Sequence, residues 1–178
     1  NPGTSIDFMS ERKRIPTSKK TRVAFVQRGE GEGAVRSQAG ETTTSTVRVG
    51  DFLAMRPGDI ATFDTPVDLV IFAVEEPFAK EIPSIIRADF DPKLSDTPGG
   101  CATDPGAYRR LLLTWDPERG PYVHHGLNCH RVRIDDSFTH YHPVDTGWDE
   151  FYLVQGAPDG AVLLTSRHTD QLEREDIG

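Results

Sequence analysis

Arg22-Val-Ala-Phe-Val-Gln27, followed by Gly29-Glu-Gly-Glu-Gly33, is the stretch that decides the expected fold. A short run rich in β-branched and aromatic residues predicts a strand, and the glycines after it predict a tight turn. The same alternation of apolar runs and turn residues recurs at residues 42–49, 52–55, 60–63 and 67–74. No long segment repeats its apolar positions with the helical period of about 3.6 residues, so helix should be minor. Short strands separated by turns favour an all-β sandwich or barrel.

The chain divides into three predicted parts. Residues 1–75 form a first module, which opens with a polar, basic arm or first strand. Residues 76–106 hold five prolines and Gly99-Gly100, which predicts a linker laid across the surface. Residues 107–178 form a second module, with strand-like runs at residues 108–115, 127–134 and 162–165.

The two modules share a short internal repeat. Residues 22–29 align with residues 150–156, with one residue missing at the turn of the second copy. Repetition of this kind indicates duplicated modules. The alignment places Arg22 at the position of Glu150.

Thr139-His140-Tyr141-His142, followed by Trp148-Asp149-Glu150, holds the most chemically informative residues of the chain. In a strand, residues i and i+2 point to the same face, so His140 and His142 project together. Glu150 follows on the neighbouring predicted strand, beyond a short loop, and its carboxylate adds an oxygen ligand. Two imidazoles and one carboxylate with open positions suit Fe(II), and also Mn, Ni or Zn. The pattern therefore predicts a divalent metal site at His140, His142 and Glu150.

This pattern resembles the first motif of the cupin superfamily, which is His-x-His, three or four residues, Glu, six residues and Gly. Here His140 and His142 are followed by seven residues, Glu150, five residues and Gly156. The loop is longer than in the family motif, and a strict count back from Gly156 selects Asp149 instead of Glu150. Neighbouring residues face opposite sides of a strand, so only one of the two acids points inward with the histidines. The internal repeat, which places the missing residue at the turn, favours Glu150.

The resemblance implies two cupin-type double-stranded β-helix (jelly-roll) modules. In the first, Arg22 stands at the ligand position and residues 1–123 contain no histidine, so we expect a degenerate module that binds no metal. In the second, the family's next motif should begin near Asp176, two residues before the end of this sequence, so we expect its C-terminal strands to be missing. In the family that motif supplies the last histidine ligand, which His125 or His130 would have to replace.

The resemblance implies a small-molecule enzyme of the dioxygenase, isomerase, decarboxylase or lyase type, whose metal acts as a Lewis acid or binds O₂. The alternative is a non-catalytic binding or structural cupin with a vestigial site. The intact His140-x-His142 and the acid after it favour the enzyme, whereas the metal-free first module and the missing last motif favour the alternative. We expect a small-molecule ligand or substrate as partner, and a homodimer as the assembly.

Composition indicates which binding partners and which cellular compartment to expect. A formal net charge of −8 argues against binding to nucleic acid, whose backbone is also negative. No stretch approaches the roughly 20 apolar residues that span a bilayer, and the first residues lack the apolar core of a signal peptide. Cys101 and Cys129 are too few for a disulfide framework, which predicts free thiols in a reducing compartment. We therefore expect a cytoplasmic protein with no membrane partner.

Overall fold

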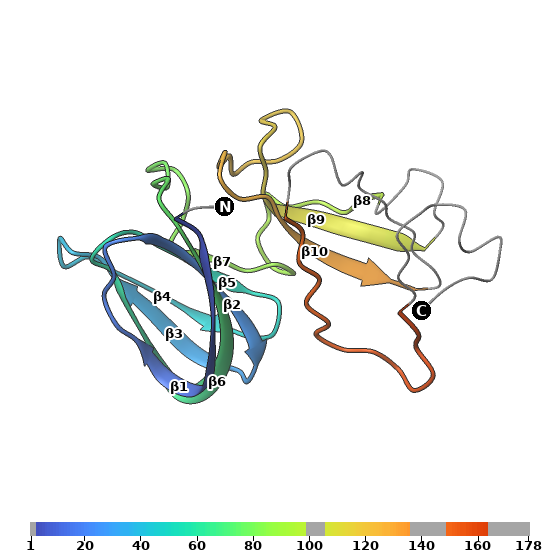
Figure 1. Cartoon of the computed structure of the whole chain (residues 1–178), viewed down its shortest axis with the longest axis horizontal. Coiled ribbons are helices and arrows are strands. Elements are labelled where there is room, and N and C mark those ends of the chain that lie inside the picture. Colours follow the sequence, from blue (N-terminus) through green and yellow to red (C-terminus); the bar gives the residue numbers. More distant parts are fainter. Residues whose placement is uncertain (1–2, 99–105, 136–148, 164–178) are drawn as a thin grey trace. The chain divides into compact units, whose positions relative to one another are not determined.

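The structure, a computed structural model, describes residues 3–98, 106–135 and 149–163. These residues contain ten strands and no helix, which confirms the all-β class (Figure 1). None of the described residues forms a helix that is long and apolar enough to cross a membrane. The chain divides into two compact units, Asn1–Phe138 and Thr139–Gly178, and all ten described strands belong to the first.

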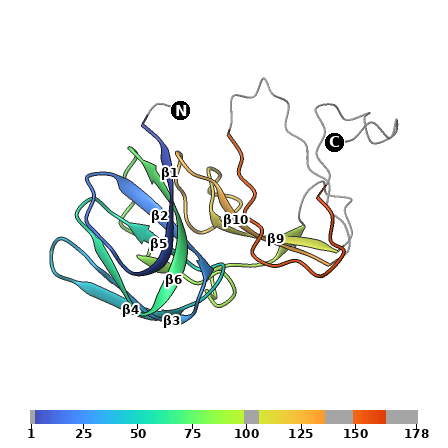
Figure 2. The same cartoon turned by 60° about the horizontal axis from the view of Figure 1, so that its bottom comes forward.

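Seven strands form one antiparallel sheet that curves into a nearly closed barrel (Figures 1 and 2). They are β1 (Ser5–Ile15), β2 (Thr21–Arg28), β3 (Gly31–Arg36), β4 (Thr42–Val47), β5 (Phe52–Met55), β6 (Ile60–Val74) and β7 (Ile85–Ile86). The order across the sheet is β4-β3-β6-β2-β5-β7, and β1 also pairs with β6. The strands expected at residues 22–27, 42–49 and 52–55 are therefore confirmed.

Strand β6 is one long strand, whereas the sequence predicted two strands broken at Thr65-Pro66. Its first half pairs with β3 and its second half with β2, while β1 pairs with both halves. Pro66 has no partner in any of these registers, so its missing N–H group removes no ladder hydrogen bond. Strand β6 therefore continues through the proline, where its partner changes from β3 to β2.

The curved sheet is buried on both faces, because apolar residues on β2 alternate between two clusters. Every strand of the sheet contributes to the inner cluster, which fills the space that the sheet encloses: Met9, Ile15, Ala24, Val26, Val35, Val47, Leu53, Met55, Ala61, Phe63, Val67, Leu69, Ile71 and Ile85. The outer cluster joins the opposite face of β2 and β5 to later parts of the chain: Val23, Phe25, Phe52, Ala54, Phe72, Phe78, Ile82, Ile86, Ala88, Leu94, Leu112, Leu113, Tyr122, Leu127 and Cys129.

The segment predicted as a surface linker is largely built into this outer cluster, which corrects the expectation. Ile82 and Ile86 are 1% and 0% exposed, and Phe78 and Leu94 are also buried. Prolines and glycines limit regular structure in the segment to short strands, but its widely spaced apolar residues still pack against the sheet. The segment also supplies β7, which pairs with β5. The proposed limits at residues 75 and 106 stay predictions.

A second, smaller sheet follows in the same unit. It consists of β8 (Thr97–Pro98), β9 (Ala107–Leu113) and β10 (Cys129–Ile134) in the order β10-β9-β8. Strands β9 and β10 confirm the runs predicted at residues 108–115 and 127–134. Residues 149–163 contain no strand, so the strand expected to carry Glu150 does not form there. The run Phe-Tyr-Leu-Val has strand propensity, but propensity without a paired neighbour does not make a ladder.

Two turns of the same design flank β5. In each, an aspartate carboxylate accepts a hydrogen bond from the N–H group three residues earlier, at 3.0 Å for Asp51 and Arg48 and at 2.8 Å for Asp59 and Arg56. The residue directly before each aspartate is a glycine with a positive φ, +95° at Gly50 and +86° at Gly58. Only glycine adopts this conformation without strain, so these Gly-Asp pairs fix the two turns that flank β5.

Candidate functional site

The three predicted metal ligands are only partly within the described structure. His140 and His142 lie outside the described residues, whereas Asp149 and Glu150 are described and exposed. The described part of the chain holds no group of three or more histidine, cysteine or acidic side chains arranged to bind a metal ion. The set His140, His142 and Glu150 therefore stays a prediction.

Glu150 has a hydrogen-bond partner that the sequence analysis did not single out. The Tyr152 hydroxyl donates a hydrogen bond to the Glu150 carboxylate. Partial burial of the hydroxyl and the nearby negative charge of Glu150 raise the pKa of Tyr152, which keeps the phenol protonated as a donor. Hydrogen bonds of this kind position carboxylates that bind metal ions. The signal in the sequence is the i, i+2 spacing, which brings two side chains to one side of an extended chain.

His125 and His130, the candidates for a replacement ligand, both belong to the first unit. His125 is exposed and precedes β10, and its backbone N–H donates to Glu76 Oε1 at 3.3 Å. His130 lies on β10, where its Nε2 is 3.0 Å from Asn128 Oδ1. Neither belongs to a group of three ligand-type side chains among the described residues.

His124 is the buried histidine of the described chain, with an exposed fraction of 2%. Its Nδ1 accepts from the Gly126 N–H group at 3.2 Å, so the ring proton is on Nε2 and is donated to the Glu76 carbonyl at 3.2 Å. The ring also packs against Phe78, with 5.0 Å between ring centroids. The neutral imidazole therefore links the loop before β10 to the segment after β6.

The folded chain should lose stability in mild acid because of His124. Burial lowers the pKa of His124, against the opposing effect of Glu76, and the charge of His125 acts in the same direction as burial. A histidine with a lowered pKa stabilises the fold fully above the unfolded-state pKa of about 6.5, and this stabilisation is lost as the pH falls below that value.

We expect the free energy of unfolding in urea to fall from pH 7.5 to pH 5.5 in the wild type. The fall should be much smaller in His124→Gln and only slightly smaller in His125→Gln, because the charge of His125 is the smallest of the causes that act on His124. Equal falls in all three proteins would contradict the assignment.

Arg22, which the repeat places at the ligand position of the first module, lies on the inner face of β2. It is 6% exposed, and its Nη2 donates to the Asp59 carbonyl at 3.3 Å. Burial lowers the pKa of Arg22, although Asp59 opposes this shift. A guanidinium has no lone pair to offer a metal ion, and the surrounding inner cluster is apolar. The contacts are those of a structural residue at one end of a packed barrel.

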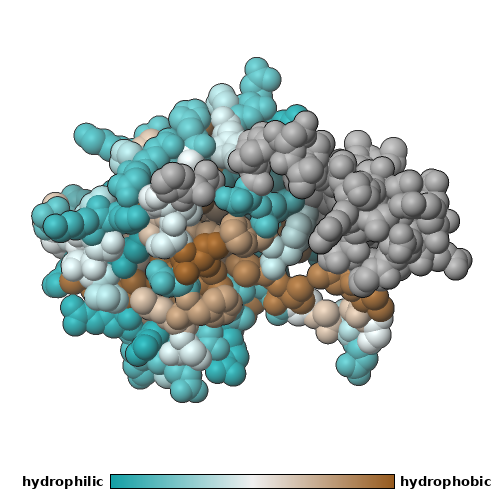
Figure 3. All heavy atoms as spheres, viewed as in Figure 1, coloured by the Kyte–Doolittle hydropathy of each residue, from teal (hydrophilic) through white to brown (hydrophobic). Residues whose placement is uncertain are grey.

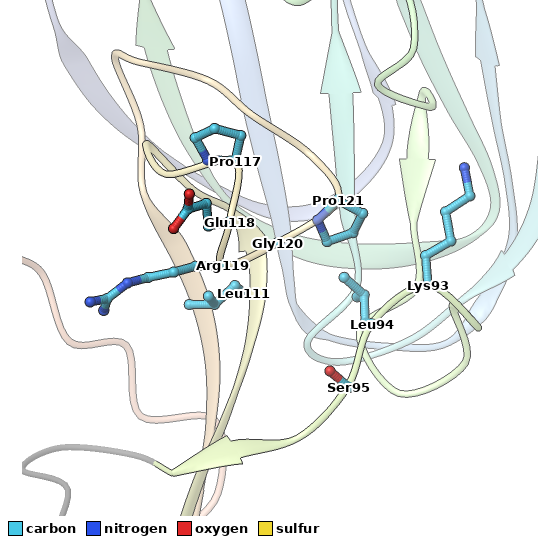
Figure 4. Close-up of a pocket in the computed structure, with 9 residues that line it drawn as sticks. All are labelled: Lys93, Leu94, Ser95, Leu111, Pro117, Glu118, Arg119, Gly120 and Pro121. Carbon is cyan, nitrogen blue, oxygen red and sulfur yellow. The ribbon is translucent and has the colours of Figure 1, made fainter.

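A shallow pocket of about 320 Å³ lies between residues 93–95 and residues 117–121 (Figure 4). Leu94 and Leu111 form its apolar floor, while Lys93 and Arg119 extend away from it on opposite sides. A specific ligand site needs polar groups that converge on one point. The lining residues of this pocket do not, and we assign it no ligand.

Comparisons with known proteins add limited information. No family model and no curated protein sequence matches the chain. Among solved structures, an oxalate decarboxylase mutant from Bacillus subtilis is 14% identical with a TM-score of 0.30, over 42% of this chain and 19% of that one. Streptomyces albus HEPD, with 2-hydroxyethylphosphonate and Fe(II) bound, is 17% identical with a TM-score of 0.31, over 41% and 18%. A Pseudomonas syringae pv. tomato protein of unknown function is 12% identical with a TM-score of 0.38, over 61% and 47%.

These structures are cupin-fold proteins, but the likeness is distant. The matched part of this chain spans less than a fifth of the oxalate decarboxylase and of HEPD. At these identities and TM-scores the likeness defines no family for the chain and transfers no function to it. Any activity must be argued from the residues of the chain itself.

Proposed function

We propose that this chain is a metal-binding protein of the cupin type that acts on a small molecule, with His140, His142 and Glu150 as its metal ligands. The observation that carries the proposal is the His-x-His pair followed by an acid and a glycine. The hydrogen bond from Tyr152 to Glu150 supports it, because carboxylates that bind metal ions commonly have a hydrogen-bond partner of this kind. The proposed reaction is of the dioxygenase, isomerase, decarboxylase or lyase type.

The donor set fits a divalent transition metal. Two neutral imidazoles and one carboxylate suit Fe, Mn, Ni or Zn, and they leave positions open for a substrate. A metal bound there supplies Lewis-acid or redox chemistry. The contribution of the chain would be to supply the Glu150 carboxylate with a hydrogen-bond partner in Tyr152 and to offer the ring nitrogens of His140 and His142 to the metal.

The alternative function is a binding or structural cupin without turnover. The first module favours it, because an apolar cluster and the buried cation Arg22 fill the barrel that would otherwise hold a site. If the first module has only a structural role, the second module can also have a structural role without catalysis. Fold alone does not separate these functions.

Metal affinity in two neighbouring variants tests the proposal. Glu150→Gln should weaken binding of Mn²⁺ or Zn²⁺ by more than about tenfold, because even the hydrogen-bond partners of ligands are worth about 10- to 100-fold. Asp149→Asn is the matched control, with the same loss of charge one residue away, and should bind like the wild type.

Titration of the metal-free protein followed by calorimetry gives both affinities. A larger loss of metal affinity in Asp149→Asn than in Glu150→Gln would identify Asp149, and not Glu150, as the ligand. Equal metal binding by the wild type and both variants would show that neither Glu150 nor Asp149 is a metal ligand.

A further inference from the structure

Strand β1 is an edge of the barrel sheet. It pairs with β6, and no other described strand pairs with it. The pairing is regular from Ser5 to Met9, and its register shifts between Met9 and Arg12 and again between Arg12 and Arg14. At the shift Glu11 has a φ of 52°, and its N–H group and the Ser10 hydroxyl bind Asp68 Oδ1 at 2.7 and 2.9 Å. The strand thus has a regular first half, Ser5–Met9, and a second half, residues 12–15, that follows the bulge and pairs with β6 less regularly.

The first half of β1 exposes large apolar side chains. Phe8 is 75% exposed and Ile6 is 39% exposed. They lie opposite Val70 and Phe72, on the face that carries the outer cluster. Figure 3 shows hydrophobic residues gathered over the part of the barrel where β1 and β6 lie. An edge strand with exposed apolar residues is a template for pairing with another strand.

The two halves of β1 are opposite in charge. Asp7 is in the first half, and Arg12, Lys13 and Arg14 form the second. Asp7 and Arg12 pair with Ile71 and Val67, both in the inner cluster, so the two charges lie on the same side of the sheet. Neither Asp7 nor Arg12 has an ion pair with a described residue.

We propose that two copies of this chain associate by antiparallel pairing of β1 with β1 of the second copy. A twofold axis near the bulge places the first half of each strand beside the second half of the other. Asp7 then faces Arg12 of the second copy. Phe8 lies near those basic side chains of the second copy that are on the same side of the sheet as Phe8. Parallel pairing would instead set like charges opposite each other, so the charge pattern specifies the second copy and its direction.

The association should be weak and sensitive to salt. The bulge interrupts the pairing, and two short strands bury less than the roughly 1,600 Å² of a standard interface. Exposed charge pairs are screened as ionic strength rises. This inference does not depend on the metal site, and its test leaves residues 107–178 unchanged.

Sedimentation velocity over a range of protein concentrations tests the interface. The wild type should shift from monomer to dimer as concentration rises, and less so at high salt. Asp7→Lys, Arg12→Asp and Phe8→Ser should each raise the dissociation constant at least tenfold. The double variant Asp7→Lys with Arg12→Asp should dimerise like the wild type. Glu30→Lys makes the same charge change at an exposed turn and serves as the control that keeps the dimer.

Thermal unfolding of each variant checks that the barrel is intact. A wild type that stays monomeric at all concentrations would overturn the proposal. So would a dimer that survives the three single substitutions, because the contact would then lie elsewhere. A folded double variant that remains monomeric would also overturn it, because Asp7 and Arg12 would not face each other.

Discussion

Asp51→Ala should destabilise the barrel by roughly 3 to 5 kcal/mol, which is the usual cost of removing one partner from a buried, hydrogen-bonded charge pair. Asp51 is 1% exposed. Its Oδ1 accepts from the Ala88 N–H group at 2.8 Å, and its Oδ2 accepts from the Arg48 N–H group at 3.0 Å and from Arg87 Nε at 3.1 Å. The alanine variant leaves all three donors without this acceptor.

Guanidinium-chloride unfolding measures this effect, and two variants control for it. Asp89→Ala removes a carboxylate that pairs with Arg48 at 3.3 Å but is 39% exposed, so it should cost about 0–1 kcal/mol. Asp51→Asn keeps one acceptor oxygen and should fall between the two. If Asp51→Ala cost no more than Asp89→Ala, the role of Asp51 in joining the turn before β5 to residues 87–88 would be wrong.

Ile86→Ala should cost about 2–5 kcal/mol, the range for truncating a fully buried isoleucine or leucine. Ile86 is 0% exposed on β7 and pairs with Phe52 of β5. It belongs to the segment that composition predicts as a surface linker, so its truncation tests whether that segment is part of the core. The variant removes apolar contacts and leaves a cavity in the outer cluster.

Ile134→Ala is the matched control, because the same atoms are removed from a side chain that is 51% exposed. It should change the free energy of unfolding by less than about 1 kcal/mol. Comparable losses in both variants would show that the segment after β6 is not held against the sheet as described.

The sequence predicts local structure well where one strand can be recognised by its own residues. Strand β5 coincides with the predicted residues 52–55, and β2 and β10 lie within a few residues of their predictions. The sequence predictions are wrong where contacts between distant parts of the chain determine the local structure. Pro66 breaks a strand pattern only if its N–H group is needed, and the register shows that it is not. Prolines in residues 76–98 conceal apolar residues that the outer cluster buries.

The candidate site is predictable from the sequence in its residue types but not in its surroundings. His140, His142 and Glu150 follow from their spacing and from the resemblance to a family motif. The hydrogen bond between Tyr152 and Glu150 depends on a side-chain conformation that no motif encodes. The burial of Arg22 inside the barrel likewise depends on which face of β2 turns inward.

The metal content of the purified protein, measured by elemental analysis after incubation with Fe(II), Mn²⁺, Ni²⁺ or Zn²⁺ and removal of free ions, tests the central claim most directly. The wild type should retain about one ion per chain, and His140→Ala should retain close to none. A wild type that retains no metal, or a His140→Ala variant that retains as much as the wild type, would contradict the account.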